Sequence, residues 1–320
     1  MTHRRSLLAA ALATPAVARA QDSRPIRLII PFPPGGATDV FGRRFAARLS
    51  TVLGVPVVPE NRSGAAGAIG GVEAARARPD GTTLLFGTAS TLAMYPLMAV
   101  NPQYDPLTSF APIGLVGSVT VAFAARPELA PTLAGVMEEA RRRPGQLRYG
   151  SPGTGSFLHL SAVRMLMEAG NVDILHVPYR GSAPAMTDLL AGQIQLLVDT
   201  VATSIEQHRA GRIRLLAVAS GTRSPLVTAV PTVSEALGLR DFDATLWTSV
   251  VAPAGTPPDI IRRLNEATLR AVGDPAFHAE LRAGGLEPAP ASTPEQTAEF
   301  IAAEIARWRP VVAAAGARID

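Results

Sequence analysis

Short apolar runs that alternate with helical patterns constrain the fold of this chain more than any other feature. Three of these runs, at 26–30, 55–58 and 83–86, have the length of buried strands. After the first run, apolar residues recur every three or four positions, as on one helix face: Phe41, Phe45, Leu49 and Val52. Strands that alternate with helices form βαβ units, so the pattern predicts an α/β fold with mostly parallel sheets flanked by helices.

Two longer extended runs, at 113–125 and 246–252, interrupt the alternation. Between them it restarts, with helices expected at 132–143, 156–168 and 183–191 and strands at 148–149, 174–177, 194–198 and 214–219. We therefore expect two α/β lobes joined by two extended crossover strands. The expected first domain comprises residues 21–123 and 248–320, and the second comprises residues 124–247. A chain of 320 residues suits two domains, because single cores stop growing at ~250–300 residues.

Three segments that contain threonine mark expected helix starts. Thr232 with Glu235 fits a capping box, in which each side chain bonds the backbone of the other residue. Thr256-Pro257 and Thr293-Pro294 each fit an N-cap followed by proline at the first helical position.

Residues 1–20 have the pattern of a secretory signal peptide. Arg4 and Arg5 form a basic start, an Ala-rich apolar stretch extends to Val17, and Ala18-Arg19-Ala20 fits a cleavage site. The apolar stretch is shorter than the ~20 residues that span a bilayer. We expect export across the cytoplasmic membrane, and the adjacent arginines also fit the twin-arginine route.

The composition excludes several kinds of chemistry. The chain has no cysteine, which removes disulfides, thiolate metal sites and a cysteine nucleophile. All 30 basic residues are arginine, so a Walker A lysine and a Schiff-base lysine are absent as well. The five histidines lack the spacing of a metal motif, and we expect no metal, no cofactor and no catalytic set.

The charge balance argues against nucleic acid as a partner. Residues 1–20 hold three arginines and no acid, which leaves 30 − 3 = 27 bases against 26 acids, or +1, for residues 21–320. A nucleic-acid-binding surface needs a basic stripe or patch. The longest basic run, Arg141-Arg142-Arg143, lies on an expected surface helix and fits a solvated face.

Two glycine-rich loops occupy the same strand-to-helix position in the two expected lobes. The proline-glycine loop is residues 31–39, and the serine-glycine loop is residues 151–156. Helix N-termini offer unpaired N–H groups and a partial positive charge, which suit an anion. Either loop alone fits an ordinary tight turn, but the two together favour a clamped anion. Thr38 and Asp39 fit helix caps, and we expect the Asp39 carboxylate to orient its own loop.

Further polar residues end other expected strands, each with a structural alternative. Thr88 and Ser90 follow the third strand, and Arg62 or Ser63 follows the second; plain turns explain both segments equally well. Arg180 fits a carboxylate contact or a structural ion pair. Asp199 fits a helix cap or an acceptor for a ligand hydroxyl or ammonium group. His159 fits a position near the cleft or in the core.

A series of motifs follows in order along the chain. They include Pro31 to Asp39, Glu60-Asn61-Arg62, Pro79-Asp80-Gly81, Tyr104-Asp105-Pro106, Ser151 to Ser156, His176 to Gly181, Asp188 to Gln193 and Ala252 to Pro257. Together they resemble the Bug, or TctC-like, extracytoplasmic solute receptors of tripartite tricarboxylate transporters. The similarity covers essentially all of residues 24–320.

This resemblance implies a periplasmic, two-lobed Venus-flytrap protein of type II-like architecture. It further implies that the protein binds a small carboxylate between its lobes and delivers it to a membrane permease, without catalysis; we expect a monomer. A receptor for a signalling partner and an exported enzyme acting on a carboxylate are the alternatives. The expected ligand-binding residues are Pro34, Gly35, Gly36, Ala37, Thr38, Asp39, Thr88, Ser90, Ser151, Gly153, Thr154, Gly155, Ser156, His159, Arg180 and Asp199.

Overall fold

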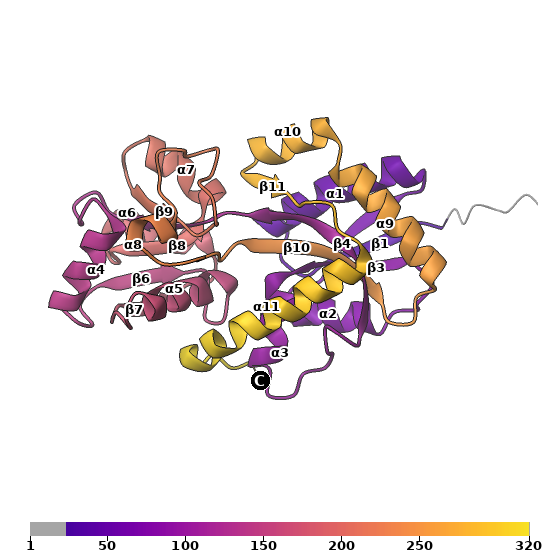
Figure 1. Cartoon of the computed structure of the whole chain (residues 1–320), viewed down its shortest axis with the longest axis horizontal. Coiled ribbons are helices and arrows are strands. Elements are labelled where there is room, and N and C mark those ends of the chain that lie inside the picture. Colours follow the sequence, from indigo (N-terminus) through magenta and orange to yellow (C-terminus); the bar gives the residue numbers. More distant parts are fainter. Residues whose placement is uncertain (1–23, 320) are drawn as a thin grey trace, which may run out of the picture.

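The computed structural model describes residues 24–319, so the expected signal peptide at 1–20 lies outside the described residues. Two lobes lie side by side, and each contains one sheet flanked by helices (Figure 1). The described part of the chain begins in the first lobe with β1, crosses to the second lobe and returns. The expected two-lobed α/β architecture is confirmed.

The sheet of the first lobe has six strands in the order β11-β4-β10-β3-β1-β2. Their bounds are β1 (Ile26–Ile30), β2 (Val57–Asn61), β3 (Thr83–Thr88), β4 (Phe110–Val119), β10 (Leu246–Pro253) and β11 (Leu286–Pro288). Strand β1 pairs in parallel with β2 and β3, whereas β10 is antiparallel to β3 and β4, and β11 is antiparallel to β4.

The sheet of the second lobe has five strands in the order β7-β6-β8-β5-β9. Their bounds are β5 (Val121–Ala125), β6 (Arg148–Ser151), β7 (Leu175–Pro178), β8 (Leu196–Thr200) and β9 (Arg214–Val218). Strand β6 is parallel to β7 and β8, and β5 is antiparallel to β8 and β9. The expectation of mostly parallel sheets therefore holds only for three strands of each lobe. Strands β5 and β10 each enter their sheet from the opposite lobe and so run antiparallel to their neighbours.

The first crossing is a nearly continuous strand. Only Thr120 separates β4, in the first sheet, from β5, in the second. The return crossing leads from β9 by way of a short helix at Val233–Leu237 into β10, whose first residue, Leu246, pairs with Val119. The two crossings therefore lie next to each other between the lobes. The domain boundaries at residues 123 and 247 stay a prediction.

Helices cover both sheets. Those of the first lobe are α1 (Ala37–Leu53), α2 (Ala68–Ala75), α3 (Tyr95–Met98), α9 (Pro258–Val272), α10 (Pro275–Ala283) and α11 (Pro294–Ala315), with a 3₁₀ turn η1 (Ala65–Gly67) and a π-helical turn η2 (Ser90–Met94). Those of the second lobe are α4 (Leu133–Arg142), α5 (Phe157–Glu168), α6 (Ser182–Ala191), α7 (Val201–Arg209) and α8 (Val233–Leu237). Within residues 24–319 no helix combines the length and the apolar character that crossing a membrane requires.

The structure tests the expected helix starts one by one. Thr232 and Thr293 each accept a bond from the backbone three residues on and complete a capping box. Helix α9, in contrast, begins at Pro258 with Pro257 in the N-cap position. The Thr256 cap is therefore wrong, because the Thr256 hydroxyl donates to the Pro253 carbonyl at 2.7 Å and closes the preceding turn instead.

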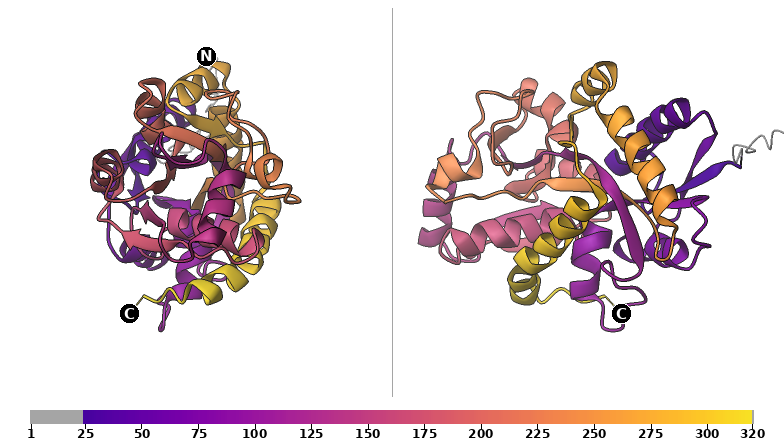
Figure 2. Two further views of the ribbon diagram at one scale, coloured as in Figure 1. Left: turned by 90° about the vertical axis from the view of Figure 1, so that its left-hand side faces the viewer. Right: turned by 45° about the vertical axis from the view of Figure 1, so that its right-hand side comes forward.

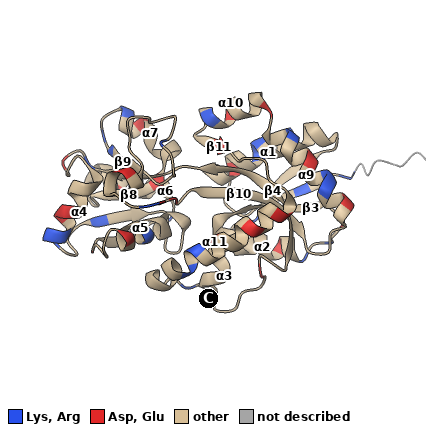
Figure 3. Ribbon diagram, viewed as in Figure 1, with Lys and Arg blue, Asp and Glu red and all other residues tan. Residues whose placement is uncertain are grey.

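The apolar core is divided unevenly. One cluster lies on the α1 and α9 side of the first sheet, around Phe41, Phe45 and Leu84. A larger cluster extends from Leu85 of the first sheet to Trp308 and into the second lobe. Helix α11 crosses from the first lobe toward α5 of the second (Figure 2). Basic and acidic residues are interspersed over both lobes (Figure 3).

Candidate functional site

The parallel strands bring the candidate residues to one edge of each sheet. The carboxyl ends of β1, β2 and β3 share one edge of the first sheet, and those of β6, β7 and β8 share one edge of the second. In Figure 1 the chain enters β1 at the end of the molecule remote from the second lobe, and β6 runs inward from α4 at the opposite end. Loops at such strand ends are where open α/β sheets bind ligands.

Asp39 organises the proline-glycine loop of the first lobe. Its carboxylate accepts from the Gly35 amide, from Arg43 Nε and from Asn61 Nδ2, each at 2.8 Å. Burial alone raises the pKa of this carboxyl, but the bonds from Gly35, Asn61 and Arg43 outweigh burial and lower the pKa below its usual value. Gly35 adopts φ +84°, a left-handed conformation that glycine accepts without strain. Asp39 thus orients its own loop, as predicted.

The loop leaves the amino end of α1 open. Gly36 holds the N-cap position without a side-chain cap, so Thr38 and Asp39 do not cap the helix and instead lie within its first turn. No group in the described part of the chain accepts from the amides of Gly36, Ala37 or Thr38. The Thr38 hydroxyl makes no bond to residues 24–319 either. These donors stand at the positive end of a 17-residue helix, where an anion is stabilised.

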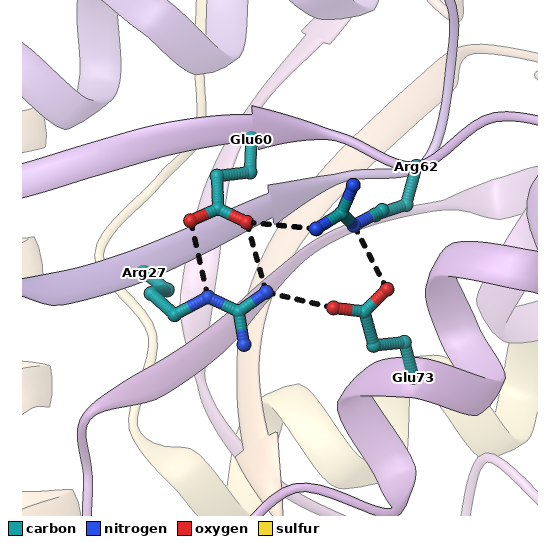
Figure 4. A network of polar contacts seen from close by, with 4 residues as sticks. All are labelled: Arg27, Glu60, Arg62 and Glu73. Atoms are coloured by element: carbon teal, nitrogen blue, oxygen red, sulfur yellow. Dashed lines mark hydrogen bonds and ion pairs between the residues drawn. The ribbon is translucent and has the colours of Figure 1, made fainter.

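A charged network braces the neighbouring turn after β2 (Figure 4). Arg27 bonds both oxygens of Glu60, at 3.1 and 2.8 Å, and reaches Glu73 of α2 at 2.7 Å. Arg62 lies 2.9 Å from Glu73 and 3.3 Å from Glu60. The hydrogen bond from Arg27 is the largest influence on Glu60 and lowers its pKa. Arg62 therefore serves this network and is not free for a ligand.

The braced turn packs directly on the two other loops of the first lobe. Gly67 has φ +91°, and a Cβ added there would lie 2.5 Å from Thr91 Cγ2 and 3.3 Å from Pro31 Cβ. The three loops of this lobe therefore form one packed surface, in which the position of the proline-glycine loop depends on the turn beside it.

The segment after β3 contributes one free hydroxyl. Thr88 and Thr91 bond each other's backbone, the Thr88 amide donating to Thr91 Oγ1 at 2.9 Å. Ser90 is buried, and its hydroxyl makes no hydrogen bond to the described residues. In the π-helical turn η2, the Thr91 carbonyl accepts a hydrogen bond from the Tyr104 hydroxyl at 2.8 Å. Such turns are frequent at functional sites.

In the second lobe, the serine-glycine loop precedes α5 as the proline-glycine loop precedes α1. Ser156 is the N-cap, and its Oγ accepts from the His159 amide at 3.1 Å while its own hydroxyl proton remains available. The Gly153 amide is directed to Ser151 Oγ, and the Gly155 amide to His159 Nδ1. Thr154 is exposed and makes no bond within residues 24–319.

Two stacked imidazole rings, those of His159 and His176, bond residues of the serine-glycine loop. The ring centroids of His159 and His176 lie 4.0 Å apart, and Tyr149 stacks on His176 at 4.9 Å. His159 accepts from the Gly155 amide at 3.1 Å, and His176 Nε2 lies 2.7 Å from Ser151 Oγ. Burial lowers the pKa of both rings to about 4, and their mutual repulsion adds to the effect on His159. The rings are therefore neutral at pH 7. Nothing in the sequence indicated that His159 of α5 and His176 of β7, which are 17 positions apart, would stack.

Arg180 and Asp199 complete the second-lobe edge. Arg180 is exposed and has no ion pair in the described part of the chain; the neighbouring Gly181 amide bonds the Pro152 carbonyl at 3.2 Å, beside the serine-glycine loop. Asp199 is 1% exposed, and its Oδ1 accepts from the Thr200 amide at 2.7 Å. Its Oδ2 is buried without a partner among residues 24–319, and burial raises the pKa of the carboxyl. Thr200, not Asp199, caps α7.

The candidate residues at the two edges include unpaired hydrogen-bond donors. Within the described range 24–319, no three His, Asp or Glu side chains gather closely enough to hold a metal ion. What the two edges present instead are helix N-terminal amides, hydroxyl groups and one free guanidinium.

Comparisons with known proteins identify the family of the chain. The family model described as tripartite tricarboxylate transporter family receptor, TctC, matches residues 41–317. Protein BugT of Bordetella pertussis is 38% identical over 312 residues, which cover 97% of this chain and 95% of BugT.

Two solved structures of Rhodopseudomonas palustris proteins are similar over nearly the whole chain. Rpa4515 with adipate is 36% identical and covers 92% of this chain and 98% of its own, with a TM-score of 0.82. MatC with bound malate is 31% identical and covers 91% of this chain and 99% of its own, with a TM-score of 0.77. From sequence and fold together, the chain belongs to the TctC family of tripartite tricarboxylate transporter receptors.

Proposed function

We propose that this chain is a periplasmic receptor that captures a small carboxylate between its lobes and delivers it to the permease of a tripartite tricarboxylate transporter. One observation carries the proposal: two helix N-termini, one from each lobe, follow the carboxyl ends of parallel strands and keep unpaired donors. The relatives with bound adipate and malate support a carboxylate as the ligand class.

The first lobe supplies the backbone half of the proposed site. The amides of Gly36, Ala37 and Thr38, together with the hydroxyls of Thr38 and Ser90, are the donors left open there. Pro34 and Gly35 shape the loop, and Asp39 holds it in place. Thr88 is used internally and contributes to the shape of the site.

The second lobe supplies the side-chain half. Thr154, Ser156 and Arg180 can each donate to a carboxylate, and Arg180 brings the only formal positive charge among the expected residues. Ser151, Gly153, Gly155 and His159 bond one another and support the loop from within. Asp199 would accept from a hydroxyl, ammonium or protonated carboxyl group of the solute.

A binding site formed by both lobes favours capture of the solute because the lobes close around it. Fixed dipoles act more strongly on an anion once water is excluded and the effective dielectric falls. A solute that touches both lobes makes all of its contacts only in the closed form, so binding shifts the population toward that form. The proposed role needs no bond to be made or broken, and we propose a receptor without enzymatic activity.

A thermal-shift screen tests the proposal. The panel contains adipate, malate, other mono- and dicarboxylates, and neutral sugars of similar size. An acid at 100 times its Kd should add ~2.7 kcal/mol to the free energy of unfolding. The acid should also be recovered chemically unchanged by mass spectrometry. A shift caused by sugars and by no acid, or conversion of the acid to product, would overturn the proposal.

A further inference from the structure

The last helix contains a buried carboxylate that both tryptophans of the chain share. Glu304 of α11 is 4% exposed, and its Oε2 accepts from Trp308 Nε1 at 3.1 Å and from Trp247 Nε1 at 2.8 Å. Its Oε1 lies 2.9 Å from Arg307 Nη1. The chain has only these two tryptophans, so both report on the same side chain.

Through Trp308 this carboxylate reaches the serine-glycine loop. The Trp308 ring packs on Phe157 with a centroid distance of 4.8 Å, and Phe157 is the first residue of α5, directly after the Ser156 cap. Arg164 of the same helix lies over Trp308 and donates to the Asp243 carbonyl at 2.6 Å, in the segment that leads to the return crossing. Helix α5 is thereby fixed against α11.

Through Trp247 the same carboxylate holds the crossing itself. Trp247 is the second residue of β10 and pairs with Ser118 of β4, two residues before the Thr120 junction of β4 and β5. Its ring packs edge-on against Phe300 of α11 at 5.1 Å. The bond from Trp247 therefore ties α11 to the return crossing, and the Trp308 ring carries this anchored helix onto Phe157 of the second lobe.

Packing alone does not require an acid at this position. An ionised carboxylate is costly to bury unless its hydrogen-bonding capacity is used, and here two indoles and one guanidinium use it. Removal of the acid would leave two buried indole N–H groups without an acceptor. A carboxylate with partners on β10 and α11 fixes the orientation of these elements more narrowly than apolar contacts would.

We infer that Glu304 is a positioning residue for solute capture: it sets the orientation of the second lobe by holding Trp247 at the crossing and Trp308 against α5. This inference rests on the proposed function for its purpose. The orientation itself is a property of the chain without solute and is measured separately.

The chain lacks cysteine, which allows two unique spin labels across the lobes. Ala47 on α1 and Thr187 on α6 are exposed, so the pair Ala47→Cys and Thr187→Cys reports the interlobe distance by double electron–electron resonance. We compare Glu304→Ala, Glu304→Gln and, as a matched control on the same helix, Glu299→Gln at an exposed site.

We expect Glu304→Ala to broaden the interlobe distance distribution without solute and to weaken binding of the strongest acid of the panel by roughly 2- to 30-fold. Glu304→Gln keeps an oxygen that accepts both indole bonds and should stay close to the parent, as should Glu299→Gln. Trp247→Phe, which retains the ring packing but not the N–H, should broaden the distribution as well. It serves as the test if Glu304→Ala fails to fold.

A lower melting temperature with an unchanged distance distribution in Trp247→Phe and Glu304→Ala would show a merely structural role and overturn the inference. Equal broadening in Glu304→Gln and Glu304→Ala would contradict the role assigned to the indole bonds. A panel in which no acid binds would overturn the proposed function, while the distances without solute would still decide the role of Glu304.

Discussion

The two glycine-rich loops precede similar helix N-termini, but side chains of different charge hold them in place. The proline-glycine loop is tied by an ionised carboxylate, Asp39, with Arg43 and Asn61 around it. The serine-glycine loop rests on His159 and His176, two stacked rings that must stay neutral. Both loops keep unpaired donors, but the first is held by an ionised carboxylate and the second by two neutral imidazole rings.

This difference separates the loops experimentally. The pKa of Asp39 is lowered, so its stabilisation is present above its unfolded pKa and is lost only at lower pH. The stabilisation from the imidazole pair is full above ~6.5 and is lost as the pH falls toward 4, because the unfolded chain takes up protons below ~6.5 while the folded chain resists. Substitutions and pH changes therefore affect one loop at a time.

The largest expected effect comes from Asp39→Asn. The change leaves the Gly35 amide and Arg43 with a weaker acceptor, and we expect a loss of about 2–4 kcal/mol in the free energy of unfolding and loss of acid binding. Urea denaturation and calorimetric titration measure the two effects. Asp259→Asn is the matched control, since Asp259 also lies in the first turn of a helix but is exposed. Equal losses in both variants would remove the special role of Asp39.

The next effect is the pH dependence of the second loop. Burial lowers the pKa of His159 and His176 to about 4, below the value of 6.5 for a free ring. The free energy of unfolding should therefore fall between pH 6.5 and pH 4, by on the order of 2–3 kcal/mol for a partly solvated pair. Urea midpoints across this range give the slope. A double variant, His159→Phe with His176→Phe, should flatten it, and an unchanged slope would count against the neutral pair.

The single variant His159→Phe tests the role of the ring nitrogen that accepts the Gly155 hydrogen bond, separately from the protonation of the ring. Phenylalanine preserves an aromatic ring beside His176 but removes Nδ1, so the Gly155 amide loses its partner. We expect a cost of about 1–3 kcal/mol in stability and weaker binding of the acid. Full retention of affinity at pH 7 would show that the Gly155 bond does not shape the site.

The smallest expected effect is that of Thr154→Ala. Thr154 is exposed and makes no bond to residues 24–319, so the melting temperature should not change. Removal of one hydroxyl donor to the solute should weaken binding by about 0.5–1.5 kcal/mol in calorimetric titration. Thr187→Ala, at an exposed threonine in the middle of α6, is the control, and an equal effect there would relocate the site.

Much of the fold follows from local patterns. Periodicity placed α1, whose buried face includes Phe41, Phe45 and Leu49, and the capping boxes at Thr232 and Thr293 appeared where predicted. The direction of the crossover strands did not follow, because strand pairing depends on which lobe a strand enters. Short elements such as β11 and the π-helical turn gave no periodic signal.

The positions of the two candidate loops were predictable from the sequence, and the individual hydrogen bonds around them were less so. The strand-to-helix position of Gly35 and Gly153 identified both loops, and the orienting role of Asp39 followed from its charge. The stacking of His159 on His176 was not predictable, since the two residues lie on different elements. Their rings are brought together by the pairing of β6 with β7. The use of the Gly155 amide by His159 likewise depends on side-chain geometry.

A crystal structure with the strongest acid of the panel tests the central claim most directly. The account predicts a carboxylate within hydrogen-bond distance of the first-turn amides of α1 and, in the same molecule, of Thr154, Ser156 or Arg180 across the cleft. A solute held by one lobe alone, or bound away from both helix N-termini, would contradict it.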